Sequence, residues 1–148
     1  MLKGKTALVT GAAKRIGKAI AHVLVENHVN VIVHYCSSSD KEMDEVLTDI
    51  NAPGVKTWKF QSDFSNIDNV DNLFEEIQNS IGTVDFLINN ASTFSPSKLS
   101  TLSIQDLNQT LSINSIAPFR LSQHMAKQKR EGSIINILDS RVKRYDMN

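Results

Sequence analysis

The sequence predicts an α/β fold built on a doubly wound parallel sheet of about five strands. Short strands rich in Val, Ile and Leu alternate with amphipathic helices, which indicates a sheet covered by helices on both faces. The first strand leads through a glycine turn directly into a helix. Residues suited to ligand contact follow the predicted strands at Gly11, His34, Asp63, Asn89 and Asp139. Because the carboxyl ends of parallel strands share one edge of a sheet, these residues predict a ligand crevice there.

The first strand-helix-strand unit is predicted from composition and periodicity. Residues 6–10 are short and apolar, as in a buried strand. Residues 15–26 carry apolar side chains at helical spacing, which predicts an amphipathic helix. Residues 29–34 are rich in β-branched side chains and predict the second strand.

The middle of the chain repeats this alternation. Residues 41–51 predict a second helix, which the turn-forming segment Asn-Ala-Pro-Gly at 51–54 ends. Residues 56–61 then form a third predicted strand, and residues 67–81 a third helix. Right-handed crossovers are expected between successive parallel strands.

The last part of the chain predicts two more strands around a longer helix. Residues 84–89 form the fourth strand, and residues 104–127 a helix that is bent or interrupted near Pro118. Gly132 precedes the fifth strand at residues 133–138. No internal repeat, low-complexity tract or linker divides the chain.

Composition narrows the class of protein. The 148 residues suit one domain, and the 16 basic and 16 acidic residues cancel, which argues against binding to nucleic acid or to an anionic membrane. No apolar run approaches the roughly 20 residues that span a bilayer, and the first residues lack the apolar core of a secretion signal. Cys36 is the only cysteine, as expected in a reducing cytoplasm. We expect no metal site.

The glycine turn after the first strand indicates a phosphate site. Its backbone N–H groups and the following helix N-terminus favour a pyrophosphate. Five residues separate Gly11 from Gly17, and Lys18 is followed by Ala19, which excludes a Walker loop; the spacing G-x-G-x-x-G is also absent. A purely structural turn is the alternative.

Further residues, in their order and spacing from Leu2 to Asp139, resemble the short-chain dehydrogenase/reductase family. These residues are Thr10-Gly11, Gly17, Asp63, Asn89-Asn90-Ala91-Ser92 and Asn114. The resemblance implies the N-terminal part of a Rossmann-like fold, with residues 1–148 as one NADP-binding domain that lacks the family's C-terminal strands and helices. It implies that Asp63 lies near the adenine and that Asn114 supports a proton relay. The cofactor contacts are then expected at Gly11, Lys14, Arg15, Ile16, Gly17, His34, Tyr35, Cys36, Ser37, Ser38, Asp63, Phe64, Asn90, Ala91 and Ser92.

A departure from the usual family motif looks like the pteridine reductase branch. Arg15 replaces the middle glycine, and His34-Tyr35 follows the second strand. This likeness implies that Arg15, Ser92, Phe94 and Asp139 contact a pterin- or folate-like substrate. Phe94 would stack on the flat ring, and Asp139 would join Asn114 in proton transfer. Alternatively, Arg15 is a solvated surface charge, Phe94 is an ordinary loop residue and Asp139 only caps the end of the strand. Ser140 is a weaker match than Asp139 to the catalytic position.

Charge predicts NADP rather than NAD as the cofactor. An acid at the end of the second strand would repel the 2′-phosphate of NADP, but the first acid after it is Asp40. Lys14 and Arg15 add positive charge, and Ser37 and Ser38 offer hydroxyl donors.

The end of the chain limits the predicted activity. By family resemblance a Tyr-x-x-x-Lys pair should follow near position 152, whereas the chain ends at Asn148 and Tyr145 has no lysine four residues later. We expect an NADPH-dependent oxidoreductase, similar to pteridine or dihydrofolate reductases, that is inactive alone. A non-catalytic nucleotide-binding remnant, or one part of a split enzyme, is the alternative.

Two structural consequences are expected if no further strand follows. The fifth strand lies at the edge of the sheet, which invites pairing with another chain. The apolar face through Leu107, Leu111, Ile113 and Ile116 is exposed. Both favour a homo-oligomer.

Overall fold

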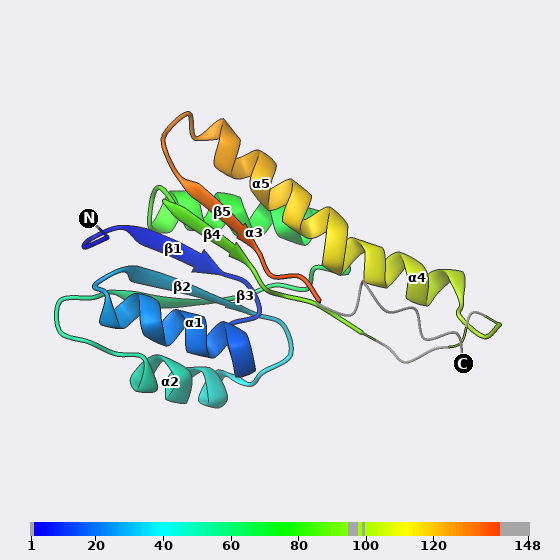
Figure 1. Ribbon diagram of the computed structural model, residues 1–148, viewed down its shortest axis with the longest axis horizontal. Helices are drawn as coiled ribbons and strands as arrows, with labels where there is room; N and C mark the ends of the chain where they lie inside the picture. The colour runs from blue at the N-terminus through cyan, green and yellow to red at the C-terminus, as the bar shows by residue number, and fades with distance from the viewer. Residues whose placement is uncertain (1, 95–97, 99, 140–148) are drawn as a thin grey trace.

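The computed structural model describes residues 2–94, 98 and 100–139, in which five strands alternate with helices (Figure 1). The ends of the elements differ from the sequence prediction by at most two residues, apart from the interrupted helix described below. The elements are β1 (Thr6–Val9), α1 (Arg15–Glu26), β2 (Asn30–Tyr35), α2 (Asp40–Asp49), β3 (Thr57–Gln61), α3 (Ile67–Ser80), β4 (Phe86–Asn89), α4 (Ile104–Leu111), η1 (Ser112–Ile116), α5 (Ala117–Lys127) and β5 (Ser133–Asn136).

The strands form one parallel sheet in the order β3-β2-β1-β4-β5. This confirms the predicted doubly wound α/β fold. From β1 the chain first builds the sheet outward through β2 and β3, and then continues on the other side of β1 with β4 and β5. The order therefore reverses between β1 and β4, and a crevice opens at their carboxyl ends.

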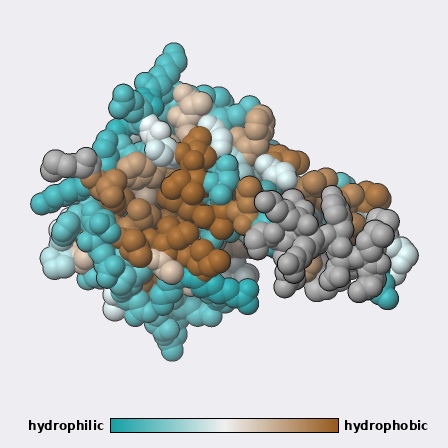
Figure 2. All heavy atoms as spheres, in the orientation of Figure 1, coloured by the Kyte–Doolittle hydropathy of each residue, from teal (hydrophilic) through white to brown (hydrophobic). Residues whose placement is uncertain are grey.

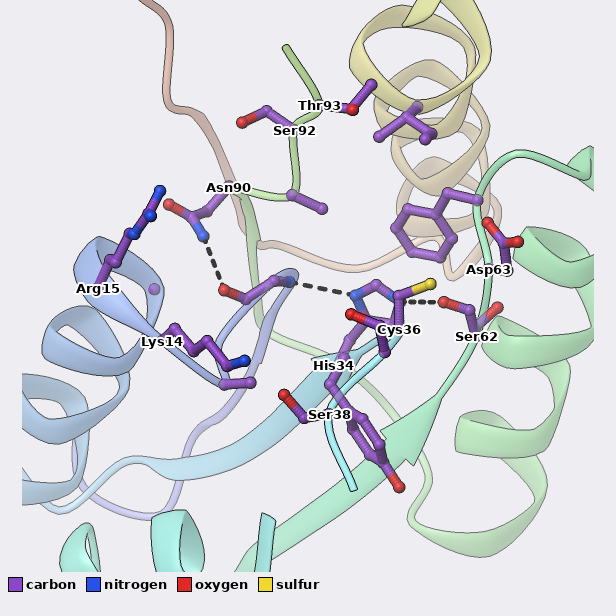
Figure 3. A pocket seen from close by; sticks show the side chains of 18 of the residues that line it. Lys14, Arg15, His34, Cys36, Ser38, Ser62, Asp63, Asn90, Ser92 and Thr93 are labelled. Atoms are coloured by element: carbon purple, nitrogen blue, oxygen red, sulfur yellow. Dashed lines mark hydrogen bonds between the residues drawn. The ribbon is translucent and has the colours of Figure 1, made fainter. Parts of the chain in front are cut away.

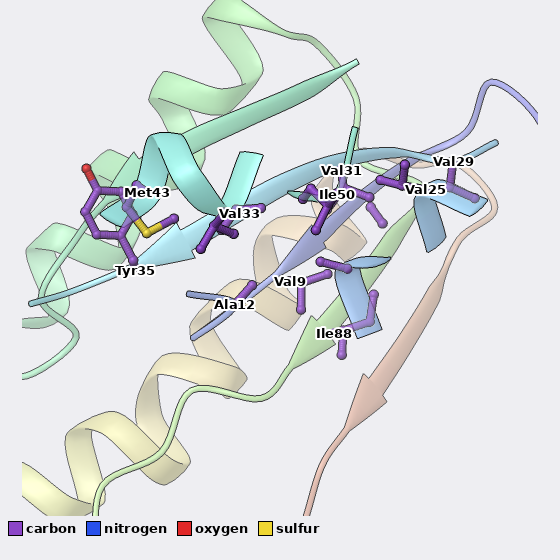
Figure 4. Close-up of a cluster of buried hydrophobic side chains, with 13 residues drawn as sticks. Val9, Ala12, Val25, Val29, Val31, Val33, Tyr35, Met43, Ile50 and Ile88 are labelled. Carbon is purple, nitrogen blue, oxygen red and sulfur yellow. The ribbon is translucent and has the colours of Figure 1, made fainter. Parts of the chain in front are cut away.

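Helices cover the two faces of the sheet. Neighbouring strand residues point to opposite faces, so Val9 packs with Val25 beneath α1 and α2, whereas Leu8 packs with Phe74 and Leu121 beneath α3 and α5. Figure 4 shows the first of these clusters. The β1 side chains are fully buried, which explains the near-continuous apolar run in the sequence.

The predicted long helix is interrupted, but the interruption is a π-helical turn rather than a kink at the proline. This turn, η1, comes directly before α5, and Pro118 lies in the first turn of α5, where its missing N–H costs little. The Ser112 hydroxyl donates to the Phe64 carbonyl at 2.8 Å and ties the turn to the end of β3. The periodicity of apolar residues does not distinguish a single π turn from a regular helix, so the sequence did not predict the π turn. It is found here together with the tertiary contact of Ser112.

The predicted exposed edge and apolar face are both present. β5 pairs only with β4 among the described strands, and Ile134 and Ile135, on its opposite faces, are 43% and 49% exposed. None of residues 104–111 in α4 is buried, and Leu107 and Leu111 are exposed as expected, whereas Ile113 packs partly against the core. Figure 2 shows apolar atoms gathered over the middle of the viewed face and on the projecting α4 end.

No helix in the described part of the chain is long and apolar enough to cross a membrane.

Candidate functional site

A cleft of about 630 Å³ opens at the carboxyl ends of β1, β2, β3 and β4, beside the first turn of α1 (Figure 3). Every residue predicted to contact the cofactor lines it, so the structure brings the predicted set together. The cleft also has lining residues that the sequence reasoning missed. These are Ala13, Ser62, Thr93 and Ile113.

The missed residues are sequence neighbours of predicted ones. Ser62 follows β3 directly and precedes Asp63, so its position at a strand end could have identified it. Thr93 follows Ser92 in the loop after β4. Ile113 comes from the π-helical turn, for which we see no sequence signal.

The turn between β1 and α1 leaves no room for a side chain at Gly11 or Gly17. Gly11 has φ +64°, and a Cβ there would lie 2.9 Å from the Cα of Ala91. A Cβ on Gly17 would press against the carbonyl oxygen of Gly11 and lie 2.5 Å from Asn90 Nδ2. Both glycines are therefore required for the close approach of β1, α1 and the loop after β4.

Asn90 holds the turn from the β4 side. Its Nδ2 donates to the carbonyl oxygens of Thr10 at 2.9 Å and of Gly11 at 3.1 Å. The Thr10 hydroxyl oxygen accepts the backbone N–H groups of Asn90 and Ala91, both at 2.9 Å. These bonds across 80 residues of sequence join the two strands at the point where the sheet order reverses.

His34 holds the same turn from the β2 side. The Gly11 N–H donates to His34 Nδ1 at 3.2 Å, and His34 Nε2 lies 2.9 Å from the Ser62 carbonyl oxygen. The Ala12 N–H donates to the backbone carbonyl of His34 at 2.9 Å. Burial lowers the pKa of His34 to about 4, so the ring is neutral at physiological pH.

The part of the cleft best suited to an anion is the first turn of α1. Helix geometry leaves the N–H groups of Arg15, Ile16 and Gly17 without an acceptor inside the helix, and they carry the positive end of the helix dipole. Arg15 adopts a left-handed φ of +51°, the conformation that a glycine would adopt without strain. No described residue forms an ion pair with Arg15, whereas Lys14 lies 3.8 Å from Glu42.

The rim at the end of β2 is uncharged. Cys36, Ser37 and Ser38 line it. Burial and the nearby Asp63 raise the pKa of the Cys36 thiol, which keeps it protonated at neutral pH. Asp40, the first acid after β2, accepts hydrogen bonds from the Tyr35 hydroxyl at 3.2 Å and from Lys59 at 3.1 Å.

Only some of the residues predicted for substrate contact and catalysis line the cleft, whereas all of those predicted for the cofactor do. Arg15 and Ser92 line the cleft, but Phe94 and Asp139 do not; Phe94 is 80% exposed in the loop after β4, and Asp139 is exposed beyond β5. The side-chain amide of Asn114 forms two hydrogen bonds with the backbone of Thr93. Its Oδ1 accepts the Thr93 N–H and its Nδ2 donates to the Thr93 carbonyl oxygen, both at 2.8 Å. In this state it positions the loop; its role in a proton relay stays a prediction.

Ser140 and Tyr145 lie outside the described residues. Within the described residues, no group of three or more His, Cys, Asp or Glu side chains could hold a metal ion.

Known proteins with similar sequences have been identified. The chain is 35% identical over 136 residues to the 3-oxoacyl-[acyl-carrier-protein] reductase FabG of Staphylococcus epidermidis, an alignment that covers 90% of this chain and 55% of that protein. The chain thus spans about half the length of this relative.

Solved structures extend the match to the fold. A short-chain dehydrogenase/reductase from Serratia marcescens superposes with a TM-score of 0.90 at 26% identity, over 99% of this chain and 60% of that one. A blue fluorescent protein from a metagenomic library, solved in complex with NADPH, gives a TM-score of 0.88 at 31% identity, over 97% of this chain and 59% of that one. The family model for short chain dehydrogenases matches residues 5–143. The chain therefore belongs to the short-chain dehydrogenase/reductase family.

Proposed function

We propose that this chain is the NADPH-binding domain of a short-chain dehydrogenase/reductase-type oxidoreductase that acts on a pterin- or folate-like substrate. The observation that carries the proposal is the cleft at the sheet's reversal point, with the tightly packed glycine turn and the N-terminus of α1 along one wall. That wall suits a pyrophosphate, because the first N–H groups of α1 have no acceptor inside the helix and carry the positive end of its dipole. Bound NADPH would supply a hydride. The NADPH complex of the similar metagenomic protein supports this cofactor.

The charges around the cleft favour NADPH over NADH. Lys14 and Arg15 lie at the start of α1, and the exposed Ser37 lies on the opposite rim, where it can donate a hydrogen bond to a 2′-phosphate. The carboxylate of Asp40 is engaged by Tyr35 and Lys59 rather than presented to a ribose hydroxyl.

A flat heteroaromatic substrate is supported by the residues beside the cleft. The exposed ring of Phe94 follows the lining residues Ser92 and Thr93, and an exposed ring can stack on a pterin. The guanidinium of Arg15, which forms no ion pair with any described residue, and the hydroxyl of Ser92 supply polar contacts. In this proposal Phe94 and Asp139 approach the substrate only when the cleft is filled. An ordinary carbonyl substrate is the second candidate, since the similar FabG is a 3-oxoacyl reductase by name.

We also propose that these residues bind the cofactor without turning over substrate. The 148 residues contain no Tyr-x-x-x-Lys segment, so none of them supplies a tyrosine proton donor held by a lysine. The exposed β5 edge and the apolar face of α4 support assembly into a homo-oligomer. The single cysteine suits a reducing, cytoplasmic setting.

Calorimetry with NADPH and NADH tests the cofactor. We expect NADPH to bind at least tenfold more tightly, because one charge-assisted bond to the 2′-phosphate is worth about 1.5–3 kcal/mol. Ser37→Asp should abolish this preference, whereas the matched Ser37→Ala should only reduce it. Failure of the wild-type chain to bind either nucleotide would overturn the proposal.

The substrate is tested separately. Dihydrobiopterin should bind the NADPH complex of the wild type more tightly than that of Phe94→Ala. The affinity for an aliphatic 3-oxoacyl thioester should be the same in both. The reverse pattern would favour the carbonyl substrate. Oxidation of NADPH by this chain alone with dihydrobiopterin or dihydrofolate would contradict the proposed lack of turnover.

A further inference from the structure

We propose that His34 is a positioning residue of the cleft, which sets the glycine turn at a defined distance from the end of β3 through an imidazole that carries its proton on Nε2. The inference rests on the proposed function in so far as the positioned turn binds a nucleotide. The bridging contacts themselves do not depend on any ligand. His34 stands between the two walls of the cleft in Figure 3.

The hydrogen bonds select one protonation state of the ring. The Gly11 backbone N–H can only donate, so Nδ1 must be an unprotonated acceptor. The Ser62 carbonyl can only accept, so Nε2 must carry the proton. A doubly protonated ring, or the Nδ1–H tautomer, would set two N–H groups against each other at Gly11.

Packing fixes the plane of the ring. His34 is 2% exposed and stacks on Phe64 with centroids 4.0 Å apart and planes 3° from parallel. Phe64 is itself buried. The ring therefore cannot turn away from Gly11 without disrupting the buried contact with Phe64 and losing both of its hydrogen bonds.

The bridge determines which groups of the turn remain for an anion. His34 accepts the Gly11 N–H on its side chain and the Ala12 N–H on its carbonyl, so both are already used. Asn90 binds the Gly11 carbonyl from the other side. The donors left to face the cleft include the first N–H groups of α1, so His34 directs a phosphate toward Arg15 and away from the start of the turn.

Two variants separate positioning from simple burial. His34→Gln keeps an acceptor and a donor about as far apart as the two ring nitrogens, whereas His34→Leu keeps neither. His22→Gln, on the exposed face of α1, controls for the loss of a histidine. We expect His34→Leu to weaken NADPH binding about tenfold, the equivalent of one net hydrogen bond, and His34→Gln to retain affinity within about threefold.

Nuclear magnetic resonance of the wild-type chain without nucleotide provides a readout that needs neither variants nor binding. We expect imidazole ¹⁵N shifts of the Nε2–H tautomer at pH 7 and a scalar coupling across the hydrogen bond between Gly11 N and His34 Nδ1. An Nδ1–H tautomer without this coupling would overturn the inference, as would a folded His34→Leu that binds NADPH like wild type. If the coupling is present but wild type binds no nucleotide, the proposed function fails and the bridge stands.

Discussion

As the pH falls, protonation of His34 should destabilise the folded chain at a higher pH than protonation of the chain's carboxylates does. Burial lowers the pKa of His34 to about 4 in the folded state, against about 6.5 in the unfolded chain. Between these values the unfolded state binds a proton that the folded state does not, so the free energy of unfolding falls as the pH falls. Above pH 6.5 neither state binds it, and this residue contributes no slope.

The magnitude follows from the two pKa values. Each pKa unit corresponds to about 1.4 kcal/mol, so the full loss between pH 6.5 and 4 is about 3 kcal/mol, a large fraction of a typical domain's stability. The paired carboxylates Asp71 and Asp85 have lowered pKa values, so their stabilisation is lost only as the pH falls below about 3.8. The window from pH 6.5 to 4.5 therefore isolates His34 from them.

Urea unfolding followed by the fluorescence of Trp58, the single tryptophan, measures this slope. Wild type should lose about 1.4 kcal/mol per pH unit in the window, and His34→Gln, which cannot be protonated, should be flat there. A flat wild-type curve, or an equal slope in the variant, would refute the neutral buried imidazole.

Three further predictions concern the turn and the apolar surface. Arg15→Gly should raise stability by up to about 1 kcal/mol in urea unfolding by relieving the left-handed backbone, while NADPH affinity falls about tenfold in calorimetry because the guanidinium is lost. Gly17→Ala should cost about 1–3 kcal/mol, because its Cβ would displace the Gly11 carbonyl and Asn90, and NADPH binding should be lost. Ile135→Lys on the β5 edge should shift sedimentation toward monomer relative to wild type.

Each of these has a matched control and a contrary outcome. Arg15→Ala retains the strained backbone without the charge, so it should lose affinity and gain no stability; equal stability of both variants would contradict the strain argument. Gly54→Ala meets no atom within 4 Å but has φ +77°, so it should lose some stability to backbone strain and leave NADPH binding unchanged. Val23→Lys adds the same charge on exposed α1, and an equal effect of both lysines, or a dilute wild-type monomer, would count against association through β5.

Local patterns predicted which residues gather along the cleft. The glycine turn, the β2 end and the Asn90 segment all follow strands, and parallel strands carry their following residues to the same edge. Phe94 and Asp139 were harder to place, because a residue several positions beyond a strand depends on the path of its loop. The path of the β4 loop is held by Asn114, which sequence reasoning had assigned to proton transfer.

The sequence by itself determined the class of fold and the edge of the sheet at which the residues predicted for ligand contact gather. These depend on periodicity and on glycines at fixed spacing, which act within a few residues of one another. Only the tertiary structure decided that His34 is a neutral bridge between Gly11 and Ser62, and that a π turn interrupts the long helix. Both arise from contacts between residues over 20 positions apart, where burial and hydrogen-bond geometry select a state that no local pattern encodes.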